Sequence, residues 1–317
     1  MGLFRTAIQL CALVVALSAA AAARAGDAPP PAVPATAEPA PVDSAPSFLP
    51  AMDSGKLLLT QGVSNIEGAA GGGLASWAVI TGYETRDAVG GNAHFTYVGV
   101  PNYSLKDFGV SVGLFDRLEL SYTREEFDTG STGARLGLGS GFTFDQDVYG
   151  AKLKLIGDAV YDQDSPLPQL AVGVQYKRND QPAIVHAVGG RSADGVDYYL
   201  AATKVLLNQS LVLDATVRLT KANQTGLLGF GGDRGDAYQP EFEGSVGYLV
   251  TRRLVIGGEY RAKPSNLGFA REGDWYDLFA AYAFSKHLSA TVAYVDLGSI
   301  ATFKSQTGVF LSLQAGF

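Results

Sequence analysis

The chain has 317 residues, of which 24 are Lys or Arg and 31 are Asp or Glu, so its formal net charge is −7. This acidic balance argues against a nucleic-acid-binding protein, which needs a basic face. The only cysteine is Cys11, so no disulfide within the chain can stabilise the fold.

Residues 1–25 have the pattern of a signal peptide. Arg5 supplies the positive charge, residues 8–17 the apolar stretch, and residues 23–25 (Ala-Arg-Ala) the small-x-small cleavage site. The apolar stretch is too short for a helix that spans a membrane. We therefore expect an exported protein that loses Cys11 with its signal, and the remaining 22 basic and 31 acidic residues then give a net charge of −9.

Residues 26–54 form a Pro/Ala-rich periplasmic linker in this interpretation, because eight of the fourteen prolines lie between Pro29 and Pro50. Such a composition favours extended chain and cannot bury a core. The favoured hypothesis is a disordered leader. The alternative is a handle for the cell wall or for a periplasmic partner.

Residues 55–90 are a separate N-terminal segment with two possible structures. Residues 68–83 are apolar but rich in glycine, including Gly71-Gly72-Gly73, and are shorter than a membrane helix. They either add one or two strands to a sheet or fold inward as a plug.

Residues 91–317 repeat a strand pattern. In the last strand, Leu311 and Leu313 point one way while Ser312 and Gln314 point the other, and the chain ends on the aromatic Phe317. Aromatic residues recur near the strand ends, as in the two girdles of a membrane barrel. The predicted strands are 91–99, 104–114, 117–127, 147–158, 168–178, 196–207, 211–222, 239–250, 253–262, 274–284, 288–297 and 306–317.

The connections alternate between tight turns and long loops, which is typical of an outer-membrane barrel with short periplasmic turns. The sequence thus predicts an all-β, up-and-down antiparallel transmembrane β-barrel of 12 strands, or 14 if residues 55–90 add two. Both termini would be periplasmic, the exterior would contact outer-membrane lipid, and the strand ending at Phe317 would engage the barrel-assembly machinery.

Two passages carry a family resemblance: LLLTQGVSNIEGAAGGGLASWAVITGY (residues 57–83) and FGVSVGLFDRLELSY (residues 108–122). They resemble an uncharacterised family of Gram-negative outer-membrane β-barrel proteins, described only as a domain of unknown function. The likeness covers residue 55 to the end. It supports the fold and transfers no site.

No catalytic, cofactor or metal site is expected. His94, His186 and His287 fall on separate segments without the spacing of metal ligands. His287 and Ser289 share a strand face, as in a lipid-active enzyme, but no acidic partner is evident. Three aspartates near a turn, Asp158, Asp162 and Asp164, suit turn chemistry better than a calcium site.

Charged residues on the inner strand faces are the candidate functional residues. Alternation directs basic side chains inward from four successive strands and acidic ones from the next three. Paired across a filled interior, they would neutralise one another; separated across water, they would make a transverse field. The residues are Lys152, Lys154, Lys177, Lys204, Arg218, Glu241, Glu243, Glu259 and Asp277.

The first functional hypothesis is a narrow channel for small solutes or ions with a charged lumen, and not an enzyme. The alternative is a non-conducting structural or anchoring outer-membrane protein. A lipid-active enzyme is the least favoured hypothesis.

Overall fold

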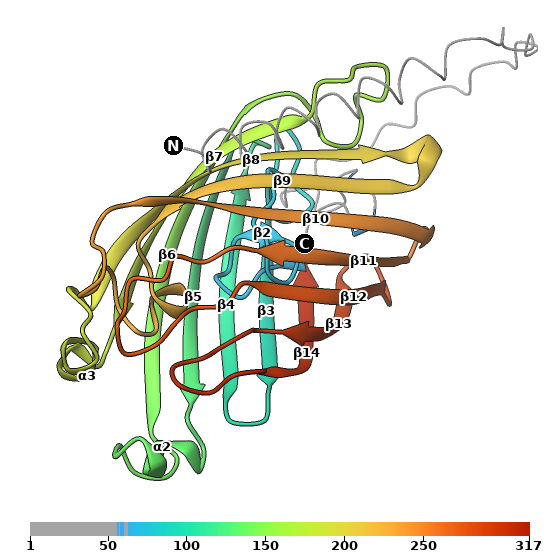
Figure 1. Ribbon diagram of the computed structural model, residues 1–317. Helices are drawn as coiled ribbons and strands as arrows, with labels where there is room; N and C mark the ends of the chain where they lie inside the picture. Colours follow the sequence, from blue (N-terminus) through green and yellow to red (C-terminus); the bar gives the residue numbers. More distant parts are fainter. Residues whose placement is uncertain (1–55, 57, 60–62) are drawn as a thin grey trace, which may run out of the picture.

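The computed structural model of the chain describes residue 56, residues 58–59 and residues 63–317 (Figure 1). The predicted signal peptide and Pro/Ala-rich linker lie outside these residues. Within the described part of the chain, no helix is both long and apolar enough to cross a membrane.

Twelve strands form a closed barrel in which each strand pairs antiparallel with its neighbours in the sequence. The barrel closes where β14 pairs with β3. The structure thus confirms the 12-strand alternative. The strands are β3 (Val89–Gly99), β4 (Ser104–Leu114), β5 (Leu118–Asp128), β6 (Thr143–Ile156), β7 (Gln169–Asn179), β8 (Asp194–Leu206), β9 (Leu211–Thr220), β10 (Gln239–Thr251), β11 (Leu254–Arg261), β12 (Trp275–Ala283), β13 (Leu288–Asp296) and β14 (Thr307–Gly316).

One rim of the barrel carries tight turns and the C-terminus, and the other carries most of the long loops (Figure 1). We call them the short-turn rim and the long-loop rim. The long loops include α2 (Thr132–Arg135), α3 (Pro182–Ala187) and the 3-10 turn η2 (Gln224–Gly226). The turn between β8 and β9 contains η1 (Leu207–Gln209).

The strands separate two chemically different faces, because alternate residues of a strand point to opposite sides of a sheet. In β14, Phe310, Ser312 and Gln314 are buried inside the barrel, while Leu311 and Leu313 are exposed outside. The exterior carries a band of exposed aliphatic residues that includes Leu120, Leu153, Val246, Ile256, Leu278 and Leu311.

Exposed aromatic residues flank this aliphatic band on both sides. On its long-loop side, rings of neighbouring strands pack together at a tilt: the ring centroids of Tyr122 and Tyr149 lie 5.2 Å apart, and those of Tyr260 and Tyr276 lie 5.1 Å apart. The aromatic residues at the short-turn rim are Phe115, Tyr161, Tyr248, Tyr282, Phe284 and Phe317. An apolar band between two aromatic girdles is typical of a transmembrane barrel.

The chain before β3 folds into the barrel. Every residue from 63 to 84 is buried, and we call this stretch the inner segment. It contains two strands of two residues each, β1 (Val63–Ser64) and β2 (Ala70–Gly71), which pair with each other and not with the wall. Of the two structures predicted for this stretch, the plug is the one that forms.

The glycine run of the inner segment is explained by its close approach to the wall. A Cβ atom on Gly72 would lie 1.6 Å from a carboxylate oxygen of Glu259 on β11, and one on Gly73 would lie 3.2 Å from the Phe310 ring on β14. Side chains at these positions would push the segment away from both strands.

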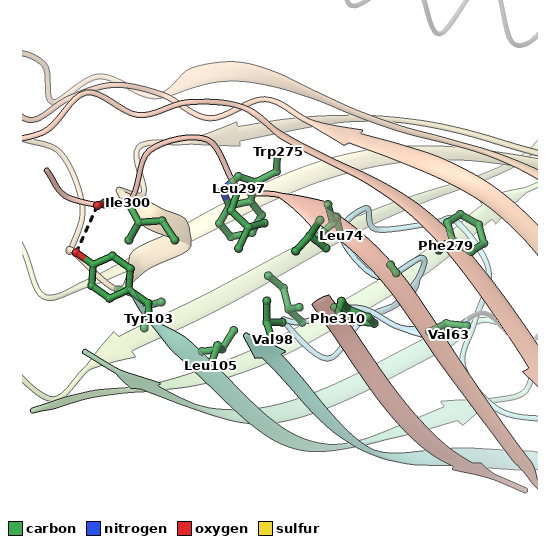
Figure 2. Packing of buried hydrophobic residues seen from close by; sticks show 14 of the residues in the cluster. Val63, Leu74, Val98, Tyr103, Leu105, Trp275, Phe279, Leu297, Ile300 and Phe310 are labelled. Carbon is green, nitrogen blue, oxygen red and sulfur yellow. Dashed lines mark hydrogen bonds between the residues drawn. The ribbon is translucent and has the colours of Figure 1, made fainter. Parts of the chain in front are cut away.

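The barrel interior has an apolar side, which runs along much of its length. Val98, Phe310 and Leu74 pack together near its middle, Tyr103 and Ile300 lie towards the long loops, and the cluster continues to Phe279 and Val63 towards the short turns (Figure 2). Elsewhere the interior carries polar and charged side chains, which form the candidate site, and a smaller apolar cluster around Trp77, Val205 and Val212.

Candidate functional site

Carboxylates of the barrel wall hold the backbone of the inner segment. Because the segment has almost no secondary structure, its buried N–H groups need partners elsewhere. Glu119 on β5 accepts hydrogen bonds from the N–H groups of Ala70 (3.0 Å) and Thr81 (2.8 Å). Glu243 on β10 accepts one from Ser76 at 2.9 Å, and Glu259 on β11 accepts one from Leu74 at 2.6 Å.

Donor side chains of the wall complete this arrangement by binding the segment's carbonyl groups. The Lys152 ammonium donates to the carbonyls of Ala70 and Val79, each at 2.9 Å, and also contacts Glu119. Arg261 donates to the carbonyl of Leu74 at 3.1 Å. The wall's inward charges therefore act as hydrogen-bond partners for the backbone that fills the barrel.

Glu67 of the inner segment is the centre of a buried ion network. Its carboxylate pairs with Lys177 on β7, with Arg261 at 2.8 Å and with Arg218 on β9 at 3.4 Å. Arg218 also contacts Glu243 at 2.5 Å, and Lys177 contacts Asp197 on β8 at 2.7 Å. All these side chains are almost completely buried, where an ion remains stable only if it is paired.

The nine residues predicted to face the lumen divide by what they contact. Five belong to the wall that surrounds the inner segment and bind its backbone or side chains: Lys152, Lys177, Arg218, Glu243 and Glu259.

The other four do not bind the inner segment. The prediction for Lys204 was wrong: this residue shares the outer face of β8 with the exposed Tyr198 and Leu200, and the loop between β6 and β7 covers its ammonium group. Lys154 pairs with Asp116 at 2.5 Å near the short-turn rim, and Lys204 donates to the carbonyl of Asp162 at 2.5 Å. Asp277 accepts the Glu259 N–H at 3.0 Å. Glu241 lies half-buried on β10, paired in register with Arg218.

Basic and acidic residues are therefore not separated across an open lumen. The inner segment fills the space between them, and Arg218 from the basic group contacts Glu243 from the acidic group directly. Of the two arrangements considered for these charges, paired or facing each other across water, the structure contains the paired one.

Sequence reasoning missed four central residues. Glu119, Asp197 and Arg261 point inward by the same alternation that identified Lys152, so this signal was present in the sequence. Glu67 lies in an irregular stretch without periodicity, and no pattern marks it as the partner of three cations.

A cleft of about 260 Å³ lies where the inner segment reaches the short-turn rim. Glu84 lines it and pairs with Lys56. Burial raises the pKa of Glu84 to about 7, and the nearby Lys56 charge opposes this shift. Asp158 accepts hydrogen bonds from the N–H groups of Val160 (2.9 Å) and Tyr161 (2.7 Å), which is turn chemistry.

The three histidines lie on separate elements: His94 on β3, His186 on α3 and His287 in the turn before β13. His287 is exposed, and its Nδ1 lies 2.8 Å from the Gly316 carbonyl, whereas Ser289 is buried on the inner face of β13. His94 and Asp107 form a buried pair on β3 and β4 at 3.2 Å. Among the described residues, no group of His, Cys, Asp or Glu has the arrangement of a metal site.

Comparison with known proteins identifies a family for almost the whole described chain. Residues 60–314 match the family described as "Protein of unknown function (DUF3034)". No curated protein matches the chain.

Several solved outer-membrane barrels resemble the fold. The KdgM porin is 10% identical, with a TM-score of 0.46 over 71% of this chain and 99% of that one. The outer membrane channel from Pseudomonas putida F1 is 13% identical, with a TM-score of 0.44 over 73% of this chain and 94% of that one. Outer membrane phospholipase A from Escherichia coli is 10% identical, with a TM-score of 0.37 over 75% of this chain and 93% of that one. At such low similarity, these likenesses carry no functional argument.

Proposed function

We propose a function for this chain, which belongs to the DUF3034 family of proteins of unknown function: a gated passage through the bacterial outer membrane. The barrel is closed at rest by the inner segment and admits a small solute when that segment moves. The short turns and both termini face the periplasm.

The chemistry of the exterior supports the membrane location. A soluble barrel would not leave Leu278 at 70% exposure and Ile256, Val292 and Leu311 near half exposure on one continuous face. The aromatic residues on both sides of this band suit the two membrane–water interfaces. The exterior therefore contacts lipid, and β14 with its terminal Phe317 is the segment offered to the barrel-assembly machinery.

The observation that carries the gating proposal is how the inner segment is held. Wall side chains bind its backbone, and its own strands do not join the wall ladder. Moving the segment would break these side-chain contacts and the hydrogen bond from the Tyr83 N–H to the Phe317 carbonyl, but it would leave all twelve strand pairings of the barrel intact. If residues 63–84 were instead strands of the wall, moving them would break the strand pairings that close the barrel.

The second candidate is a non-conducting structural or anchoring protein, in which residues 26–54 reach the cell wall or a periplasmic partner. Complete burial of residues 63–84 favours it, because a permanently filled barrel passes nothing. The two candidates differ in whether weakening the inner contacts opens the barrel.

Single-channel recording in planar bilayers separates them through Glu119→Ala. This change removes the acceptor for two N–H groups of the inner segment and the ion partner of Lys152. We expect the wild-type protein to remain closed for most of the recording and Glu119→Ala to increase the open probability at least tenfold.

Glu126→Ala is the matched control, since Glu126 lies on the same strand and points to the outer face. It should behave as wild type. A Glu119→Ala barrel that still shifts with heat in detergent gels, as a folded barrel does, yet never opens, would favour the structural candidate.

A further inference from the structure

A cavity of about 140 Å³ lies inside the barrel between the inner segment and the long loops. Ile66 and Leu74 of the inner segment border it, Val98 and Phe310 belong to its wall, and Leu297 and Ile300 come from the loop between β13 and β14. Figure 2 shows Leu297 and Ile300 towards the long loops, and Leu74, Val98 and Phe310 nearer the middle of the interior.

The lining of the cavity is almost entirely apolar. None of the described residues that line it is charged, and its polar members are Ser104, Thr129, Gln224 and Thr225. The indole N–H of Trp275, which also lines the cavity, is buried and has no hydrogen-bond acceptor among the described residues. This lining contrasts with the charged network around Glu67 on the other side of the interior.

We propose that this cavity is a binding site for a compact, uncharged, apolar molecule such as a small aromatic hydrocarbon. An apolar cavity of about 150 Å³ remains dry in other proteins and binds benzene or xenon, so the volume suits a ligand of this size. A carboxylate or an ammonium group would be buried here without a partner, which is strongly unfavourable. The Trp275 N–H leaves room for one acceptor atom on the ligand.

The site adjoins the element that closes the barrel. Ile66 is the neighbour of Glu67, and Leu74 is held through its backbone by Glu259 and Arg261. A second apolar cavity, of about 30 Å³, lies on the other side of the inner segment, bordered by Val63 and Phe279. Apolar surface thus flanks the segment on both sides, which suits an apolar solute that passes when it moves.

The identity of the solute rests on the proposed function, whereas binding in the cavity does not. A ligand can occupy this site in a barrel that never opens. Binding and conductance therefore fail independently and are measured separately.

Binding is tested with fluorobenzene by 19F NMR on the full chain in lipid nanodiscs, since detergent tails could enter the cavity. We expect saturable binding to the wild-type protein, displaced by benzene and not by benzoate. Val295→Phe should weaken binding at least tenfold, because Val295 is fully buried on the inner face of β13 and borders the cavity.

Val292→Phe is the matched control, because Val292 lies on the outer face of the same strand and is 51% exposed. It should bind fluorobenzene as wild type does. The proposal is overturned if wild type shows no saturable binding, if benzoate displaces the probe as well as benzene, or if Val295→Phe binds equally well. If Val295→Phe does not fold, the proposal is tested on the wild-type protein alone, by whether benzene displaces fluorobenzene and benzoate does not.

Discussion

Glu67→Gln should lower the free energy of unfolding of the barrel by about 3–5 kcal/mol. Removing one partner of a buried ion pair leaves an uncompensated charge, and here three cations lose a shared anion. Gln has nearly the same shape as Glu, so the loss of charge dominates. Equilibrium urea unfolding in liposomes measures the effect, and Trp77 of the inner segment, whose indole donates to Ser245 of the wall at 2.9 Å, provides the fluorescence signal.

Asp236→Asn provides the comparison for this result. Asp236 pairs with Lys221 at 2.9 Å in an exposed long loop, and exposed ion pairs contribute little to stability because water screens them. If Glu67→Gln and Asp236→Asn changed stability equally, the buried network would not be what holds the inner segment.

Leu311→Arg should block stable membrane insertion. Leu311 lies near the middle of β14, is 47% exposed, and belongs to the aliphatic band. An Arg on the lipid face costs about 2–4 kcal/mol at the membrane midplane. The amount of protein folded in outer membranes after sucrose-gradient fractionation measures the effect.

An Arg placed at the rim of the barrel tests whether the loss of insertion depends on depth in the membrane. Val89 is 48% exposed at the first residue of β3, near the short-turn rim. The cost of an Arg falls to about 0–1 kcal/mol near the interface, so Val89→Arg should insert almost as wild type does. Equal loss at both positions would mean that the aliphatic band does not lie in the membrane.

The barrel could be predicted from the sequence because its information is local. A strand with one apolar and one polar face has a period of two, which is visible within ten residues. The β4 prediction, 104–114, matches Ser104–Leu114, and β9 begins at Leu211 as expected. The β6 prediction began four residues late, because Thr143 lies in a stretch that resembles the preceding polar loop.

The arrangement of the interior could not be predicted in the same way. Alternation places Lys177 and Arg218 inside, but it does not say what they meet there. Their shared partner, Glu67, precedes Lys177 by 110 residues in a stretch without regular structure. An irregular segment is held by contacts with distant residues, and a single sequence carries no periodic signal for such contacts.

The reactivity of one buried thiol tests most directly whether the inner segment closes the barrel. Ser64 is fully buried in this segment, and its hydroxyl has no hydrogen-bond partner among the described residues, so Ser64→Cys is a mild change. It is made with Cys11→Ser, so that it is the only thiol, and compared with Ser140→Cys in an exposed loop.

The measurement is the rate at which a charged maleimide labels each thiol in the folded protein. We expect the Ser64→Cys thiol to react at least a hundredfold more slowly than the Ser140→Cys thiol, and Glu119→Ala to reduce this difference as it opens the barrel. Equal labelling rates at the two positions in the otherwise wild-type barrel would mean that the inner segment does not close it.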